Sequence, residues 1–275
     1  MGDTIKFLDI IADMHTHTIF SKHAYSTVKE NADVAVERGI DFLAITDHYY
    51  GSDDKIDRIN ELTRMAYIGK NVNHEWVNII SGAEFNLNQA LKSDVRVDEV
   101  CEKCKWRLAG FHSWFLNPYE ICLDSVPEYF EEMISGHTTP QEFDGPTDHL
   151  MPPAAFAHIE RELFKCCDAT PQRVKETLTR IVDLALENNI ILEINETSLL
   201  TSNSSNKHRE LMEYWISYAL NSGKPVMFSF GSDAHYCSMV GSFENAVDLA
   251  NKLGIAPEQI INHKVNRELL QNLLS

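Results

Sequence analysis

The sequence has a marked shortage of positive charge. Its 275 residues include 24 Lys and Arg against 41 Asp and Glu, so with the 12 His counted as neutral the formal net charge is -17. Proteins that bind nucleic acid use Lys and Arg to neutralise phosphates, and this deficit excludes a broad basic surface. We therefore expect no stable binding of nucleic acid. Small anionic substrates held through metal ions remain compatible with the charge.

Long apolar runs are also missing. No stretch approaches the roughly 20 apolar residues that cross a bilayer, and the start of the chain lacks the arrangement of a signal peptide. We expect a cytoplasmic protein that does not associate with membranes. The oligomeric state is left open.

Cysteines are few, and their spacing is irregular. A chain of this size does not need disulfides for stability, so the six cysteines are expected to be reduced thiols. Cys101 and Cys104 form a CxxC pair, which a zinc site or a redox pair would use. A zinc ribbon needs a second such pair, and the adjacent Cys166 and Cys167 do not supply it. A structural role for the pair is the simpler interpretation.

Glycine and proline are too scarce for a low-complexity segment, at 12 and 9 residues. Neither a GxGxxG nor a Walker-type phosphate loop is present, which removes the main support for a nucleotide-binding fold. The chain is long enough to bury a large core and lies within the size of one βα barrel. We expect a single domain over residues 1–275.

The stretch from Ile10 to Gly51 contains four histidines in a pattern that indicates a βαβ unit. Residues 10–13 are a short apolar run typical of a buried strand, and alternation along a strand points His15 and His17 the same way. His23 follows in a short loop. Residues 28–38 suit a helix that ends at Gly39, and residues 40–46 form a second apolar run that ends at Asp47 and His48. Potential metal ligands therefore follow both strands.

The same alternation continues to the end of the chain. Further strands are expected at residues 76–83, 107–111, 154–157, 190–194 and 225–230. Helices are expected within residues 53–70, 118–135, 170–185, 211–222, 246–253 and 265–274. Seven strand–helix repeats with polar residues at strand ends favour an α/β fold with a closed parallel barrel rather than an open sheet. The active site is then expected at the carboxyl ends of the strands.

One segment, Gly136 to Pro153, is rich in turn-forming residues and contains His137 and His149. Long loops in compact domains are usually functional or disordered. This loop insertion, at about residues 136–153, has two interpretations. It is either a lid that covers the barrel mouth and selects substrates, or a solvent-exposed loop without such a role.

Nine residues at or near strand ends are candidate metal ligands. They are His15, His17, His23, His48, Glu84, His112, His158, Asp233 and His235. Seven imidazoles and two carboxylates are too many for one ion. Nitrogen and oxygen ligands without thiolate suit Zn²⁺, Mn²⁺ or Fe²⁺ better than Mg²⁺ or Ca²⁺.

Seven short motifs carry a resemblance to a known family. In chain order they are DMHTHT, HAYST, AITDH, GAEFN, GFH, FAH and GSDAH. Their order and their local sequences resemble the PHP family of metal-dependent phosphoesterases, named for polymerase and histidinol phosphatase. The resemblance covers nearly the whole chain. The HAYST motif in particular resembles the PHP subgroup whose members have a trinuclear zinc site. The resemblance implies a distorted (β/α)7, TIM-like barrel of PHP type.

The resemblance also implies how three divalent ions are shared among the nine ligands, most simply as zinc, with manganese or iron as alternatives. One ion is held by His15, His17, Glu84 and Asp233. A second is held by Glu84, His112 and His158, and a third by His23, His48 and His235. One carboxylate can offer an oxygen to each of two neighbouring ions, as in two-metal hydrolases.

The expected reaction is hydrolysis of a small phosphate monoester by a hydroxide that bridges two metals, with histidinol phosphate as the specific substrate hypothesis. Glu84, Asp233 and His235 are the expected catalytic residues, and Arg161 is a candidate substrate residue that clamps the phosphate. Asp13 and Asp47 are candidate acceptors that fix histidine tautomers.

Three alternatives stay open. A phosphodiesterase on nucleotides or short oligonucleotides would use the same metals. An amidohydrolase-type C–N hydrolase also opens with HxH and ends with an Asp, but that scheme has no role for His23, His48 or Glu84. A non-catalytic metal-binding protein would be expected to have lost ligands, and all nine are present.

Overall fold

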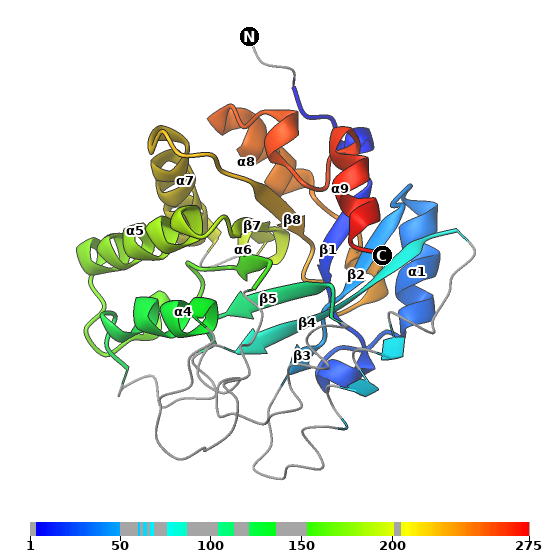
Figure 1. Cartoon of the computed structure of the whole chain (residues 1–275), viewed down its shortest axis with the longest axis horizontal. Helices are drawn as coiled ribbons and strands as arrows, with labels where there is room; N and C mark the ends of the chain where they lie inside the picture. Colours follow the sequence, from blue (N-terminus) through cyan, green and yellow to red (C-terminus); the bar gives the residue numbers. More distant parts are fainter. Residues whose placement is uncertain are drawn as a thin grey trace.

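The computed structural model describes residues 4–49, 76–86, 104–112, 121–135, 153–200 and 205–274, with a few helical positions between 60 and 68. Its strands form one parallel sheet surrounded by helices (Figure 1). In sheet order the strands are β1 (Ala12–Thr16), β2 (Phe42–Ile45), β4 (Asn78–Asn86), β5 (Trp106–Gly110), β6 (Ala155–Ala157), β7 (Ile191–Asn195) and β8 (Phe228–Gly231). A short eighth strand, β3 (His48–Tyr49), pairs with β4 outside this path.

The first and last strands of the path meet at their carboxyl ends. Thr16 forms a parallel bridge with Ala234. The backbone N–H of His17 donates to the carbonyl of Ala234 at 2.9 Å, and that of Asp233 donates to the carbonyl of His15 at 2.8 Å. The sheet is therefore a nearly closed barrel, as predicted. This closure brings the beginning of the chain beside residues 231–235.

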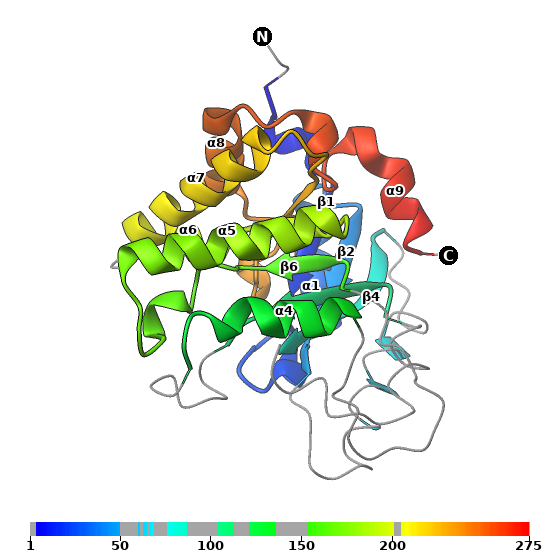
Figure 2. The ribbon, with the colours of Figure 1, turned by 60° about the vertical axis from the view of Figure 1, so that its left-hand side comes forward.

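Helices cover the outside of this barrel. The α-helices are α1 (Val28–Glu37), α4 (Ser125–Ser135), α5 (Pro171–Glu187), α6 (Glu196–Leu200), α7 (Ser205–Asn221), α8 (Glu244–Leu253) and α9 (Arg267–Asn272). The 3₁₀ helices are η1 (Phe7–Asp9), η2 (Ile19–Ser21), η5 (Leu163–Lys165), η6 (Cys237–Met239), η7 (Pro257–Gln259) and η8 (Lys264–Asn266). Figure 2 shows α4, α5 and α7 side by side over one side of the barrel. Within the described residues, no helix is both long enough and apolar enough to cross a bilayer.

Local sequence signals account for several helix ends. Thr27 and Glu30 form a capping box at the start of α1, with each side chain bonded to the other residue's backbone N–H. Thr170 caps α5, and Pro171 occupies its first turn, as the sequence predicts. Gly254 ends α8 with a φ of 72°, a conformation that glycine adopts without steric cost. These signals fix where each helix begins or ends beside its strand.

The apolar side chains form two clusters on opposite faces of the strands. The larger includes Phe156, Leu192 and Phe228 and packs against α4, α5, α7 and α8. The smaller includes Trp106 and Leu108 together with Ala155 and Ala157 of β6. Two-sided burial explains why the strands are nearly continuous apolar runs rather than alternating patterns.

The strands differ from the sequence prediction mainly at their ends. β1 runs to Thr16 and β4 to Asn86, so His15 and Glu84 lie within strands rather than after them. The β1–β2 register is irregular between Asp13 and Thr16. β3 and α6 were not predicted, because two and five residues are too short to give a periodic pattern.

Some predictions fall on residues that the structure does not describe. They are most of the helix expected at 53–70, the beginning of the helix expected at 118–135, Cys101, and the 136–153 segment with His137 and His149. The segment's described neighbours are the end of α4 at Ser135 and the start of β6 at Ala155. Because His158 follows the other end of β6, these neighbours lie toward the edge opposite the catalytic one, and they do not support the argument for a lid.

Candidate metal centre

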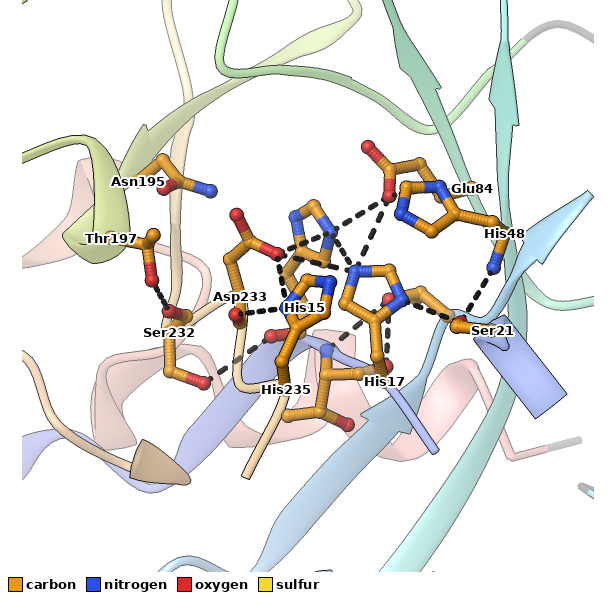
Figure 3. Close-up of polar contacts among 12 residues, drawn as sticks. His15, His17, Ser21, His48, Glu84, Asn195, Thr197, Ser232, Asp233 and His235 are labelled. Carbon is orange, nitrogen blue, oxygen red and sulfur yellow. Dashed lines mark hydrogen bonds and ion pairs between the residues drawn. The ribbon is translucent and has the colours of Figure 1, made fainter. Parts of the chain in front are cut away.

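The nine candidate ligands lie at or beyond the carboxyl ends of the strands. Figure 3 shows His15, His17, His48, Glu84, Asp233 and His235 gathered in one place. His15 lies in β1, His48 in β3 and Glu84 in β4. The others come from the turns that follow strands or, for His23, from the segment after η2; they are His17, His23, His112, His158, Asp233 and His235. Six strands of one parallel sheet, β1, β3, β4, β5, β6 and β8, and the segment after η2 thus deliver these side chains to a single place.

Glu84 occupies the middle of this cluster and is 1 % exposed. Its Oε2 lies 3.2 Å from His15 Nε2, 3.4 Å from His17 Nε2 and 3.0 Å from His48 Nδ1, and its Oε1 lies 3.3 Å from His112 Nε2 and 2.8 Å from His158 Nε2. Each carboxylate oxygen therefore faces its own set of imidazoles. This is the arrangement that sharing of one carboxylate between two cations requires.

Asp233 closes the cluster on the β8 side. Its Oδ1 lies 3.2 Å from His17 Nε2 and 3.4 Å from His235 Nδ1. Asp233 and His158 have φ angles of 54° and 31°, a region that residues other than glycine rarely adopt. Backbone strain of this kind is found at functional sites, where the surrounding structure holds it.

The three imidazoles assigned by resemblance to a third ion also lie together. The ring of His23 is 5.0 Å from that of His48 and 4.6 Å from that of His235, centroid to centroid. The ring nitrogens of His48 and His235 form a compact group with His17, all within 4.8 Å of one another. His17 therefore lies between the position expected for the third ion and that expected for the first.

The donor chemistry of the cluster suits divalent cations. Burial lowers the pKa of His17 to about 4, and burial also lowers the pKa of His48 well below its usual range. Burial would raise the pKa of Glu84, but the charges of His48, His15 and His112 outweigh it and hold that pKa well below its usual range. Neutral imidazoles and ionised carboxylates, facing one another with lone pairs and shielded from water, are the forms that bind metal.

His15 is the exception in its protonation. Burial opposes its charged form, but Glu193, Glu84 and Asp233 raise the pKa of His15 well above the usual value. A cation bound there would release this proton, so metal binding at this position is expected to compete with protons.

Glu193, which was given no role from the sequence, holds His15 in place. Its Oε1 lies 2.6 Å from His15 Nδ1, and its Oε2 accepts from the backbone N–H of His158 at 3.0 Å. The partner on Nδ1 leaves Nε2 of His15 to face Glu84. A Cβ at Gly231 would lie 2.0 Å from Glu193 Oε1, so glycine is needed for this approach. The one sequence signal for Glu193 is that its carboxylate stands inside the apolar run ILEIN, where a charged residue is unusual.

The predicted roles of Asp13 and Asp47 need correction. Asp13 accepts from the backbone N–H groups of His15, Ser232 and Gly241, so it joins β1 to the β8 turn and bonds to no described imidazole. Asp47 accepts from the Ser21 hydroxyl at 2.6 Å, and Ser21 Oγ lies 3.0 Å from His17 Nδ1. Asp47 therefore acts on His17 through a serine rather than directly.

A cavity of about 210 Å³ opens beside the cluster. Metal-ligand candidates line it together with Arg161, Glu162 and Lys165. Arg161 Nη1 lies 2.8 Å from Asp233 Oδ2, and its Nη2 donates to Asn195 Oδ1 at 2.9 Å. The guanidinium is thus held against a ligand candidate, and a cation lies at the edge of the space where a small anion would enter.

Comparisons with known proteins agree with this architecture. The PHP domain matches residues 13–197. A probable phosphatase of Vibrio parahaemolyticus is 26% identical over 279 residues, covering 95% of this chain and 93% of that protein. A probable phosphatase of Caldanaerobacter subterraneus is 26% identical over 274 residues, covering 94% of this chain and 90% of that protein.

Among solved structures, the histidinol phosphate phosphatase of Lactococcus lactis, crystallised with zinc, L-histidinol and phosphate, superposes with a TM-score of 0.54. The two sequences are 14% identical, and the alignment covers 89% of this chain and 94% of that one. This likeness concerns the fold.

A nearly closed parallel barrel with clustered histidines and carboxylates at its carboxyl edge defines the class of barrel proteins built to hold metal ions. Within that class, the chain belongs to the PHP domain family. The family and the fold predicted from the sequence are both confirmed.

Proposed function

We propose that this protein is a metal-dependent hydrolase of phosphoric ester bonds that acts on a small phosphate monoester. The observation that carries the proposal is the Glu84 carboxylate, which faces five imidazoles within 3.4 Å at the edge of a 210 Å³ cavity with two cationic side chains. The cavity has room for a small ester. The Vibrio and Caldanaerobacter relatives carry the name of phosphatase, and the Lactococcus structure contains phosphate and an amino alcohol.

Three divalent ions, most simply zinc, fit the ligand set. The grouping proposed from the family resemblance is His15, His17, Glu84 and Asp233 for one, Glu84, His112 and His158 for another, and His23, His48 and His235 for the last. In the structure, ligand atoms lie within 4.8 Å of one another in four sets, which are His15 with His17 and Asp233, His15 with Glu84 and His158, His48 with Glu84 and His112, and His17 with His48 and His235. When bound, such ions lower the pKa of coordinated water and neutralise the charge of a phosphate.

Residues next to the ligand candidates hold the side chains of this site in position. Glu193 fixes the orientation of His15, and Ser21 links Asp47 to His17. Arg161 orients Asp233 through the 2.8 Å contact and adds positive charge where a phosphate would approach. Burial of the ligands excludes water, which strengthens every electrostatic interaction with a bound anion.

The clustering of His23, His48 and Glu84 favours this proposal over an amidohydrolase-type reaction, which has no use for those residues. The test is a panel of phosphate monoesters, including histidinol phosphate, matched with phosphodiesters and amides of similar size. The protein as purified without chelator should release phosphate from monoesters faster than it cleaves the other two classes. Faster cleavage of diesters or amides would contradict the proposal.

A further inference from the structure

Two cysteines outside the metal centre lie against each other on the surface. Cys122 Sγ and Cys167 Sγ are 3.4 Å apart, although 45 residues separate them in the sequence. Both residues are exposed. Cys122 lies just before α4 and Cys167 just before α5, so the pair joins the segments that follow β5 and β6.

Backbone and ionic contacts hold the two thiols in this position. The backbone N–H of Cys167 donates to the carbonyl of Ile121 at 2.9 Å, and that of Leu123 donates to Asp168 Oδ1, also at 2.9 Å. Arg173 then pairs with Asp168 at 2.5 Å and with Asp124 at 2.8 Å. These hydrogen bonds and ion pairs hold the two backbone segments together, and this places the two sulfurs in contact.

The surroundings favour thiol chemistry over a metal site. Cys122, Cys167 and Asp168 have ligand atoms close enough to share a cation. However, one oxygen of Asp168 accepts from the backbone and the other pairs with the guanidinium of Arg173. That cation would repel a divalent ion, and two thiols with no free third ligand among the described residues are too few for a structural zinc site.

Two of the other described cysteines are poorly placed to react. Cys104 and Cys166 are buried, and burial raises the pKa of each thiol to about 12. Cys237, which is half-buried, lies in η6 after β8. The sulfurs of Cys122 and Cys167 are both exposed and lie 3.4 Å apart, and either one can donate the hydrogen bond between them. Either thiol can therefore attack a small disulfide while the other completes the exchange.

We propose that Cys122 and Cys167 form a thiol–disulfide exchange site that takes a low-molecular-weight disulfide as its oxidant. The thiolate of one of the two cysteines attacks one sulfur of that disulfide, which forms a mixed disulfide and expels one small thiolate. The other cysteine loses its proton and attacks the protein sulfur of the mixed disulfide, and the second small thiol leaves. Two protein thiols are oxidised to one disulfide while one small disulfide is reduced to two thiols.

The product would cross-link a segment that borders the cavity beside the metal centre to the segment before α4. Glu162 and Lys165, which line the cavity, lie within five residues of Cys167. The cross-link would thus fix the segment after β6 to the segment before α4. This consequence depends on the cavity's position and not on the reaction proposed for the metal centre.

Incubation of the folded, metal-loaded protein with oxidised glutathione tests the proposal, with intact mass and peptide mapping as readouts. The wild type should lose two thiols, gain no glutathione, join the Cys122 and Cys167 peptides, and revert with dithiothreitol. Cys122→Ser should stop at one glutathione on Cys167. Cys166→Ser, the matched control beside the pair, should still cross-link, whereas Cys167→Ser should not.

The proposal is overturned if the wild type accumulates glutathione adducts without the cross-link, or keeps all its thiols. It is equally overturned if Cys167→Ser still forms a disulfide to Cys122, because the partner would then be Cys166.

Discussion

Glu84 is the residue on which the account of the metal centre depends most. Its two oxygens face different imidazoles, so its charge is placed to balance two cations at once. We expect Glu84→Gln to lower turnover by on the order of a hundredfold or more, because a neutral amide cannot charge-balance and bridge two ions. Turnover and metal content of the same preparation measure this. Near-normal turnover with full metal content would show that the bridging assignment is wrong.

Glu196 offers a buried carboxylate as the matched control. It accepts from the backbone N–H groups of Asn245 and Ala246 and so caps the start of α8, away from the imidazoles. Glu196→Gln should cost about 1 kcal/mol of folding stability, the size of a weakened cap, and leave turnover unchanged. A loss of turnover in both variants would point to general destabilisation.

Glu193 should affect the metals without touching them. Its carboxylate lies 2.6 Å from His15 Nδ1 and raises the basicity of that ring. We expect Glu193→Gln to weaken metal affinity about 10- to 100-fold, the usual effect of changing the partner of a ligating histidine. Competition with a calibrated chelator gives the affinity. Wild-type affinity in this variant would mean that the contact does not position the ligand.

At the scale of single residues, the sequence indicates the candidate metal ligands more readily than the residues that hydrogen-bond to them. His15 and His17 are recognisable because a two-residue spacing on a strand predicts one shared face. Glu193 has no such spacing, since its role depends on the approach of Gly231 from β8, 38 residues later. Asp13 and Asp47 were placed near the right histidines, but their contacts depend on backbone N–H groups and Ser21, which no side-chain pattern encodes.

Among the elements, the strands were predictable because both their faces are buried. Each path strand is a short apolar run bounded by polar residues, and the observed strands overlap all seven expected ranges. β3 was missed because its two residues become a strand only through pairing with β4. The extension of β1 through His15 was missed because polar residues normally end such a run, whereas here they face the site.

The 136–153 segment gives a prediction at the scale of an element. The sequence-based hypothesis assigns it to substrate selection, but its described neighbours lie toward the amino edge of β6. We therefore expect replacement by a short Gly/Ser turn to leave metal content and the ranking of phosphate esters unchanged, since catalytic residues of such barrels lie at the opposite edge. Relative rates across an ester panel measure this. A changed ranking with intact metal content would restore the role in substrate selection.

For the whole molecule, metal binding should be linked to stability. The cluster gathers imidazoles and carboxylates from positions as far apart in the sequence as His15 and His235, and most of them are buried. Ligands that bind only the folded state stabilise it, by about 2.7 kcal/mol for each site at a hundred times its Kd. We expect chelation to lower Tm and Zn²⁺ to restore it, with about three ions per chain by elemental analysis.

A chain that stays metal-free after exposure to Zn²⁺, Mn²⁺ and Fe²⁺ would contradict this linkage. Magnesium at the same concentration is the control ion, because an all-oxygen preference makes it a poor match for seven imidazoles.

The most direct test of the central claim is the rate of phosphate release from a small monoester, measured on one preparation before chelation, after chelation and after Zn²⁺, Mn²⁺ or Fe²⁺ is returned. The account predicts turnover as purified, its loss in the metal-free protein, and its recovery with at least one of these ions. Undiminished turnover in protein shown to be metal-free, or no phosphate release by fully loaded protein from any monoester, would contradict it.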